Sequence, residues 1–132
     1  MLNVTDAEFD ALVTRAMGEL PSLYIEGMEN VAIVYADEPD EHQRRSAHLD
    51  ERNLLLGLYE GSPLIQRGAG YTFVLPDKIT LFKKSLMAIS STPEQFYQEI
   101  KRTLWHEIAH HYGLNHGDMD RLMKHKNAAG HQ

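Results

Sequence analysis

The segment from Thr92 to Gly113 constrains the fold most, because it carries helix signals at both ends. Thr92 suits the N-cap position, Pro93 suits the first helical position, and Gln95 stands where it completes a capping box. Gly113 stands where a residue in the left-handed conformation commonly ends a helix. Between these ends, apolar side chains recur four residues apart, at Phe96, Ile100, Leu104 and Ile108. The segment is therefore predicted to form a helix of roughly 20 residues, about 30 Å long, which would cross a small domain.

Chain length and composition place this helix in a globular protein. The 132 residues correspond to one domain with one hydrophobic core. Hydrophobic residues make up 42% and charged residues 24%, which excludes disordered and collagen-like chains. The formal net charge of −6 provides no basic surface for nucleic acid or for an anionic membrane, so neither is an expected partner. We therefore expect a single domain over residues 1–132.

Missing residue types and segments narrow the possible classes further. The chain contains no cysteine, which excludes disulfides, cysteine-ligated zinc and thiol nucleophiles. No apolar run approaches the roughly 20 residues that span a bilayer. Residues 1–10 lack the basic and apolar stretches of a signal peptide. A cytoplasmic protein is the expectation that follows.

The rest of the chain predicts an α+β fold. A capping box of Thr5 and Glu8 begins an amphipathic helix that Pro21 ends. Short apolar runs predict four strands, at residues 31–36, 54–59, 71–75 and 79–82. The charged segment 37–52 has no apolar period and is predicted to be a surface loop. Residues 127–132 are predicted to form a frayed tail.

The end of the long predicted helix carries a metal-binding pattern, His106-Glu107-Ile108-Ala109-His110. Residues four apart share a face of a helix, so the imidazoles of His106 and His110 can bind one ion. Neutral imidazole binds Zn²⁺ at about 2.0–2.1 Å. Glu107 follows the first ligand, and its carboxylate would reach the fourth coordination position, where it can take a proton from a metal-bound water. The pattern therefore predicts a zinc site with Glu107 as the general base.

A third zinc ligand is predicted just beyond this helix. Gly113 tolerates a positive φ, so the chain can turn back sharply and return His116 to the same ion. Three protein ligands leave one coordination position open, which distinguishes a catalytic zinc site from a closed structural one. The spacing from Gly113 favours His116, although Asp118 or Asp120 could supply a carboxylate oxygen instead.

Other polar and aromatic side chains are interpreted by their positions. His111 points about 100° away from His110 around the helix, so a packed or hydrogen-bonded role is expected for it rather than metal binding. Tyr59 either donates to a developing oxyanion or simply stands at a strand end. Trp105 and Tyr112 are expected to be core aromatics. The remaining histidines are expected on the surface or in the tail, at His42, His48, His125 and His131.

Several segments together carry a resemblance to a known family. They are the opening amphipathic helix, Val31-Ala32-Ile33-Val34, Leu55-Leu56-Gly57-Leu58-Tyr59-Glu60-Gly61, Leu75-Pro76-Asp77-Lys78-Ile79-Thr80-Leu81-Phe82 and His106-Glu107-Ile108-Ala109-His110-His111-Tyr112-Gly113. Over roughly residues 5–120, the chain resembles the small bacterial minimal-zincin family of zincin-like metallopeptidases. The resemblance implies a compact zincin-like α+β fold with bound zinc, in which a small mixed sheet packs against the N-terminal helix and the long metal-binding helix. It implies peptidase activity only by class.

The sequence departs from full metzincins after the predicted third ligand. Those proteins carry a methionine turn well downstream, beneath the metal, whereas only 16 residues follow His116 here. Met119 and Met123 are the candidates for an apolar floor. The chain also lacks a sizeable C-terminal subdomain that would form the far wall of a cleft. Substrate binding is therefore expected to be shallow or to be completed by a partner.

A zinc-dependent metallopeptidase is the predicted function, acting on a peptide or protein through a zinc-activated water. Zincins commonly hold an extended peptide by β-addition to a strand beside the metal helix, and residues 71–75 or 79–82 would form that edge. The alternative is a catalytically silent metal-binding interaction or regulatory module, for which a fourth protein ligand would be expected.

Overall fold

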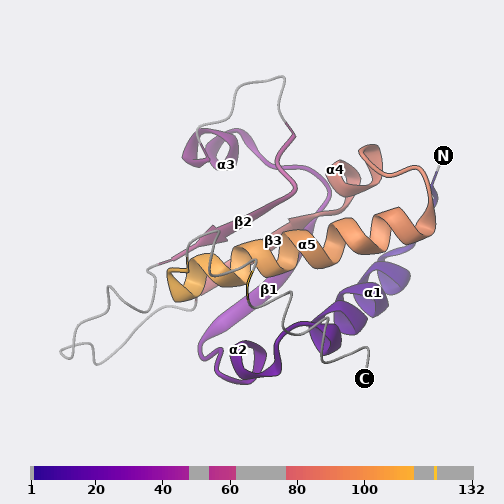
Figure 1. Cartoon of the computed structure of the whole chain (residues 1–132). Coiled ribbons are helices and arrows are strands. Elements are labelled where there is room, and N and C mark those ends of the chain that lie inside the picture. The colour runs from indigo at the N-terminus through magenta and orange to yellow at the C-terminus, as the bar shows by residue number, and fades with distance from the viewer. Residues whose placement is uncertain (1, 48–53, 62–76, 115–120, 122–132) are drawn as a thin grey trace.

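The structure is a computed structural model that describes residues 2–47, 54–61, 77–114 and 121. Within these residues the fold is α+β, as predicted, with helices around a three-stranded sheet (Figure 1). The elements follow one another as α1 (Asp6–Glu19), α2 (Ser22–Glu26), β1 (Val31–Ala36), α3 (Glu41–Ser46), β2 (Gly57–Glu60), β3 (Asp77–Phe82), α4 (Lys83–Ala88) and α5 (Pro93–Tyr112). None of the helices in this part of the chain combines the length and apolar character needed to cross a bilayer.

The sheet has the strand order β1-β3-β2, so β3 is its central strand. β3 runs parallel to β1, with Ile33 opposite Ile79, and antiparallel to β2, with Tyr59 opposite the same Ile79. Of the two alternatives for a peptide-binding edge, residues 79–82 are therefore wrong, because β3 is paired on both sides. Among the described strands, the edges of the sheet belong to β1 and β2.

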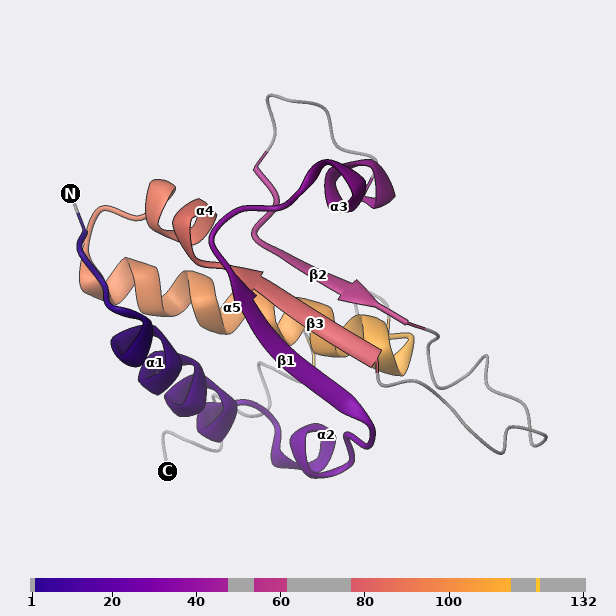
Figure 2. The ribbon, with the colours of Figure 1, turned by 180° about the vertical axis from the view of Figure 1, so that it is seen from behind.

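Helices α1 and α5 form one layer against the sheet. α5 crosses the face of the sheet over β2 and β3, with α1 beside it (Figure 1), and the view from behind shows the strands in front of α5 (Figure 2). The predicted stripe of α5 is buried in the core, together with apolar side chains of α1 and β3. These residues are Phe9, Val13, Ala16, Ile79, Leu81, Phe96, Ile100, Leu104 and Ile108. Burial of this stripe fixes which face of α5 turns toward the sheet.

The predicted ends of the two long helices are confirmed, with one correction. Thr5 and Glu8 form the reciprocal capping box of α1. At the start of α5, the Thr92 hydroxyl accepts from the Gln95 N–H at 3.1 Å. The Gln95 side chain accepts from the N–H of Ser91 at 2.8 Å, one residue before the N-cap, so the box predicted for α5 is displaced by one residue. At the other end Gly113 adopts φ 70°, the left-handed conformation expected of it.

The charged segment after β1 contains a helix, α3, although it was predicted to be a loop because it has no apolar period. Asp40 and Gln43 form a reciprocal capping box, with bonds of 2.7 Å and 3.0 Å, at the start of α3. The prediction of a loop over residues 37–52 is therefore wrong for Glu41–Ser46. This six-residue helix buries no side chain, so its cap stabilises it and an apolar stripe does not.

The strand boundaries also differ from the predicted ones. β2 begins at Gly57 rather than at residue 54, and β3 begins at Asp77 rather than at residue 79. The predicted strand at residues 71–75 and the predicted tail at residues 127–132 lie outside the described residues.

Candidate metal centre

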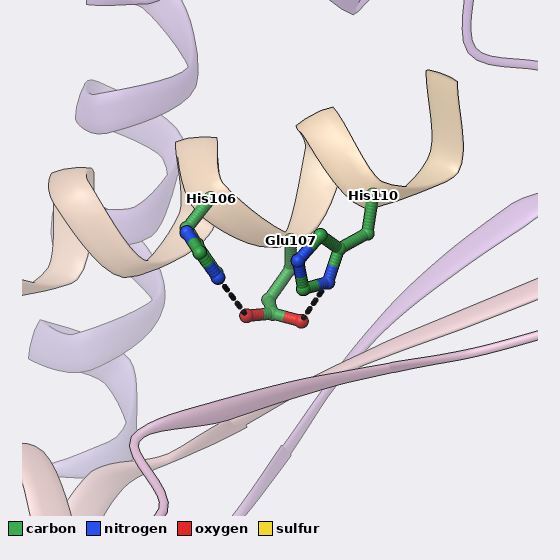
Figure 3. Close-up of side chains that lie close together, drawn as sticks. All are labelled: His106, Glu107 and His110. Atoms are coloured by element: carbon green, nitrogen blue, oxygen red, sulfur yellow. Dashed lines mark ion pairs between the residues drawn. The ribbon is translucent and has the colours of Figure 1, made fainter. Parts of the chain in front are cut away.

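The last turns of α5 bring His106, Glu107 and His110 together (Figure 3). One ligand atom from each residue lies within 4.8 Å of those of the other two. The centroids of the two imidazole rings are 4.4 Å apart, as the i, i+4 spacing on a helix requires. Both rings remain partly accessible, with side-chain exposures of 36% for His106 and 47% for His110. The two rings can therefore present nitrogen atoms to one ion.

The carboxylate of Glu107 lies between the two rings, on the side that faces β2 (Figure 3). Its Oε1 accepts a hydrogen bond from the backbone N–H of Tyr59 at 2.9 Å and lies 3.3 Å from Nδ1 of His110. Its Oε2 lies 4.0 Å from Nε2 of His106. Glu107 is only 5% exposed, so its orientation is set by these neighbours rather than by solvent.

The close approach of β2 to α5 depends on Gly57. A Cβ at this position would lie 2.6 Å from Cγ2 of Thr103 and 3.4 Å from Cγ of Glu107. Because glycine has no Cβ, the strand can lie directly against the helix, which brings the amide of Tyr59 within reach of Glu107. No role was predicted for Gly57 from the sequence, although a glycine inside an apolar strand pattern is a known signal of close backbone approach.

The carboxylate of Glu107 also changes the acidity of its neighbour. The pKa of His110 is raised above its ordinary value of 6.5, mainly because the ring hydrogen-bonds to Glu107. Partial burial opposes this rise, and the negative charge of Glu107 adds to it. A metal ion binds the neutral imidazole, so protons compete with a metal for this ring. The site is therefore better suited to metal at neutral pH than at acid pH.

Comparisons with known proteins point the same way as this geometry. A family model described as "Zincin-like metallopeptidase" matches residues 28–125, well over half of the chain. The chain belongs to this family. A solved structure, a conserved hypothetical protein from Thermus thermophilus, is similar in fold, with a TM-score of 0.54 and 23% sequence identity. The similarity covers 81% of this chain and 92% of that chain. No curated protein matches the chain.

Asp77, Tyr59 and His111 form a buried polar cluster between β3, β2 and α5. Oδ2 of Asp77, at the start of β3, accepts a hydrogen bond from the Tyr59 hydroxyl at 2.5 Å and lies 3.0 Å from Nδ1 of His111. Asp77 is 2% exposed and His111 is fully buried. Oδ2 of Asp77 is therefore shared between a side chain of β2 and a side chain of α5. The hydrogen bond expected of His111 is confirmed. The Tyr59 hydroxyl, which was considered as an oxyanion donor, donates instead to Asp77.

Asp77 was not predicted from the sequence to be a site residue. The available signal was a carboxylate two residues before the predicted strand at residues 79–82, because a carboxylate that becomes buried must find polar partners. Those partners come from β2 and α5, and no local sequence pattern predicts which side chains of other elements they are.

The third ligand predicted for the zincin-like site, His116, lies outside the described residues, as do the alternatives Asp118 and Asp120. The two methionines considered for an apolar floor, Met119 and Met123, also lie outside them. The described centre therefore consists of two histidines and Glu107.

Trp105, Tyr112 and His42 are not part of the described cluster of His106, Glu107 and His110. Trp105 is buried in the core, and the half-buried Tyr112 packs against the core, so both are core aromatics as expected. His42 is exposed on α3, again as expected. Three further histidines lie outside the described residues, His48, His125 and His131.

A surface cavity of about 380 Å³ opens next to the centre. One wall is formed by residues 54–57, which lead into β2, and the other by Arg102, Thr103, His106 and Glu107 of α5. Three consecutive leucines therefore face a site that also contains the candidate ligand and base. Leu54 is 50% exposed at the mouth of this cavity.

Proposed function

We propose that this zincin-like protein is a zinc-dependent metallopeptidase in which His106, His110 and His116 hold the ion and Glu107 is the general base. The observation that carries the proposal is the position of the Glu107 carboxylate between two imidazoles, all three within 4.8 Å. Two imidazoles one helical turn apart fit zinc, and the chain has no thiolate to form a closed cysteine site. When bound, zinc would act as a Lewis acid toward water and a substrate carbonyl.

The general-base role of Glu107 follows from its surroundings. Its carboxylate is buried on the side of β2, where the Tyr59 amide holds one oxygen. A carboxylate held in one orientation can take a proton from the attacking water and pass it to the leaving amine. His106 and His110 lie on either side of it, so the proton transfer would occur next to the bound ion.

The substrate is proposed to be an extended peptide lying along β2. β2 is an edge strand among the described strands and packs against α5, whereas β3 is paired on both sides. The carbonyl groups of Gly57 and Tyr59 are directed toward this edge, because Leu56 forms the ladder bond with Phe82 and the pattern alternates along the strand. The cavity lined by residues 54–57 would take an apolar side chain of the peptide.

Substitution of the base tests this proposal. We expect Glu107→Gln to bind zinc with the stoichiometry of the wild type and to lower peptide hydrolysis by about 10²–10⁴-fold, the usual contribution of a general base. The measurements are zinc content by elemental analysis and cleavage of a broad peptide library by mass spectrometry. The control is Glu94→Gln, at an exposed position in the first turn of α5, which should leave hydrolysis unchanged.

The outcome also distinguishes the alternative function. Zinc-loaded wild-type protein that cleaves no peptide in the library would overturn the peptidase proposal. Stoichiometric zinc in that protein would then favour a metal-binding interaction or regulatory module.

A further inference from the structure

We propose that Asp77 is a positioning residue for the metal centre, acting through Tyr59 and His111 to hold β2 against α5 so that the Tyr59 amide fixes Glu107. The Asp77 carboxylate hydrogen-bonds to Tyr59 and His111 rather than being one of the three residues of the described centre. Its effect on the centre is carried by Tyr59, whose side chain binds Asp77 and whose backbone binds Glu107. The kinetic consequence rests on the proposed function, whereas the structural consequence does not.

A single carboxylate oxygen joins three elements of the fold. Oδ2 of Asp77 accepts from the Tyr59 hydroxyl of β2 at 2.5 Å and lies 3.0 Å from Nδ1 of His111 on α5. The backbone N–H of Asp77 donates to the carbonyl of Asn30, just before β1, at 2.8 Å. The carboxylate is therefore held by its own strand and cannot move without disturbing β2 and α5.

The backbone of Tyr59 is turned toward the metal centre by the strand register. The N–H of Phe82 donates to the carbonyl of Leu56 at 3.0 Å, and this pattern repeats at every second residue of an antiparallel ladder. Tyr59 stands opposite Ile79 at the intervening position, so its N–H points away from β3. It donates instead to Oε1 of Glu107 at 2.9 Å. One residue therefore links the buried cluster to the base.

The end of β2 is shaped to lie close to Asp77. Gly61 follows the strand with φ 151°, a conformation that side-chain-bearing residues rarely adopt. A Cβ at Gly61 would overlap Oδ1 of Asp77. Both Gly57 and Gly61 thus permit a backbone approach that a Cβ would prevent, one toward α5 and the other toward Asp77.

Packing alone does not account for a carboxylate at this place. Burial of a carboxyl group carries a desolvation penalty that an apolar side chain of similar volume would avoid. What the carboxylate adds is direction, because its two partners must stand at defined positions on β2 and α5. Directional bonds of this kind would keep the general base in a fixed position. This matters because a small displacement of a catalytic group can lower the reaction rate by about 10²-fold.

The test compares two tyrosine hydroxyls of the same protein. Tyr59→Phe removes one oxygen from the cluster, and Asp77→Asn keeps the size of the side chain. Tyr35→Phe is the matched control, because the Tyr35 hydroxyl also donates to an aspartate, Asp10, at 2.7 Å, at the opposite edge of the described sheet. Hydrogen exchange of the amide of residue 59 is measured by NMR in the full chain, with the amide of Phe82 as the internal reference.

We expect the amide of residue 59 to exchange at least about tenfold faster in Tyr59→Phe and Asp77→Asn than in the wild type, because its hydrogen bond to Glu107 is weakened. The amide of Phe82 should keep its rate, and Tyr35→Phe should change neither. With the peptide substrate found for the wild type, kcat should fall by about 10–100-fold while KM changes little. Zinc content should be unchanged.

Two results would overturn the positioning role. Equal acceleration at residues 59 and 82 would show a general loss of stability, and an unchanged rate at residue 59 in both variants would show that Asp77 does not hold this amide. A wild-type protein without hydrolytic activity would remove the proposed function but leave the exchange comparison intact, so the two failures are distinguishable.

Discussion

Two tyrosine–aspartate pairs, one at each edge of the described sheet, show how surroundings change the role of the same side chains. Tyr35 of β1 donates to Asp10 of α1, and Tyr59 of β2 donates to Asp77. Asp10 is exposed, so water can replace either partner of the first pair. Asp77 is 2% exposed and is shared with His111, so the second pair has no such substitute. The β1 side is therefore tolerant of change, whereas the β2 side is organised by directional bonds beside the metal centre.

The largest difference between the two sides is expected on removal of each aspartate. Asp77→Ala should lower the free energy of unfolding by about 2–5 kcal/mol, because the Tyr59 hydroxyl and Nδ1 of His111 lose a buried partner. Asp10→Ala should lower it by less than about 1 kcal/mol, as for most exposed positions. Urea unfolding measures both values. Equal losses would show that burial does not separate the two pairs.

Stabilisation by zinc is expected to depend on the residues beside β2 that form the centre. At a free zinc concentration of about 100 times the Kd, binding to the native state should raise the free energy of unfolding by about 2.7 kcal/mol. Thermal unfolding with zinc and with a chelator measures the effect. His106→Ala should remove it, and His42→Ala, on the exposed α3, should retain it. The same stabilisation in both variants would place the metal elsewhere.

Substitution of two glycines by alanine is expected to change the stability of the protein in opposite directions. Gly57→Ala should destabilise the protein by about 1–3 kcal/mol, because the new Cβ overpacks the contact with Thr103. Gly18→Ala, near the end of α1, meets nothing within 4 Å and should stabilise the protein by up to about 1 kcal/mol through helix propensity. The measurement is the midpoint of denaturant unfolding. A stabilising Gly57→Ala would contradict the close approach of β2 to α5.

The smallest expected effect concerns the exposed pair at high pH. Burial and the hydrogen bond to Asp10 raise the pKa of Tyr35 from 10 to about 12. A group with a raised pKa contributes stability below its ordinary value and loses it as pH rises through the folded value. The wild type should therefore lose more stability than Tyr35→Phe between pH 10 and 12. Parallel pH profiles of the two proteins in urea unfolding would show that this pair contributes nothing.

The elements that sequence patterns predicted well are those whose signals are local. The caps of α1 and the buried stripe and left-handed end of α5 depend on residues within a few positions of one another. The i, i+4 spacing of His106 and His110 belongs to the same class, because a helix alone brings the rings together. The helix α3 was missed although its Asp40–Gln43 box is also local, since an apolar period was taken as the required signal.

The arrangement around the carboxylates was not predictable in this way. Which strand stands at the edge depends on pairing between residues far apart along the chain, and residues 79–82 proved to be central. The partners of Asp77 come from β2 and α5, 18 and 34 positions away. The alternation of apolar and polar residues within a strand does not show which other strands pair with it.

By itself, the sequence determined the long helix, its two histidines and the glutamate between them, because helical geometry acts over one or two turns. The tertiary structure decided what holds that glutamate. The Tyr59 amide lies 48 positions away along the chain and reaches Glu107 only because β2 pairs with β3 and packs, through Gly57, against α5. Contacts of this range exist only in the folded chain, since no local propensity encodes which distant segment will meet a helix.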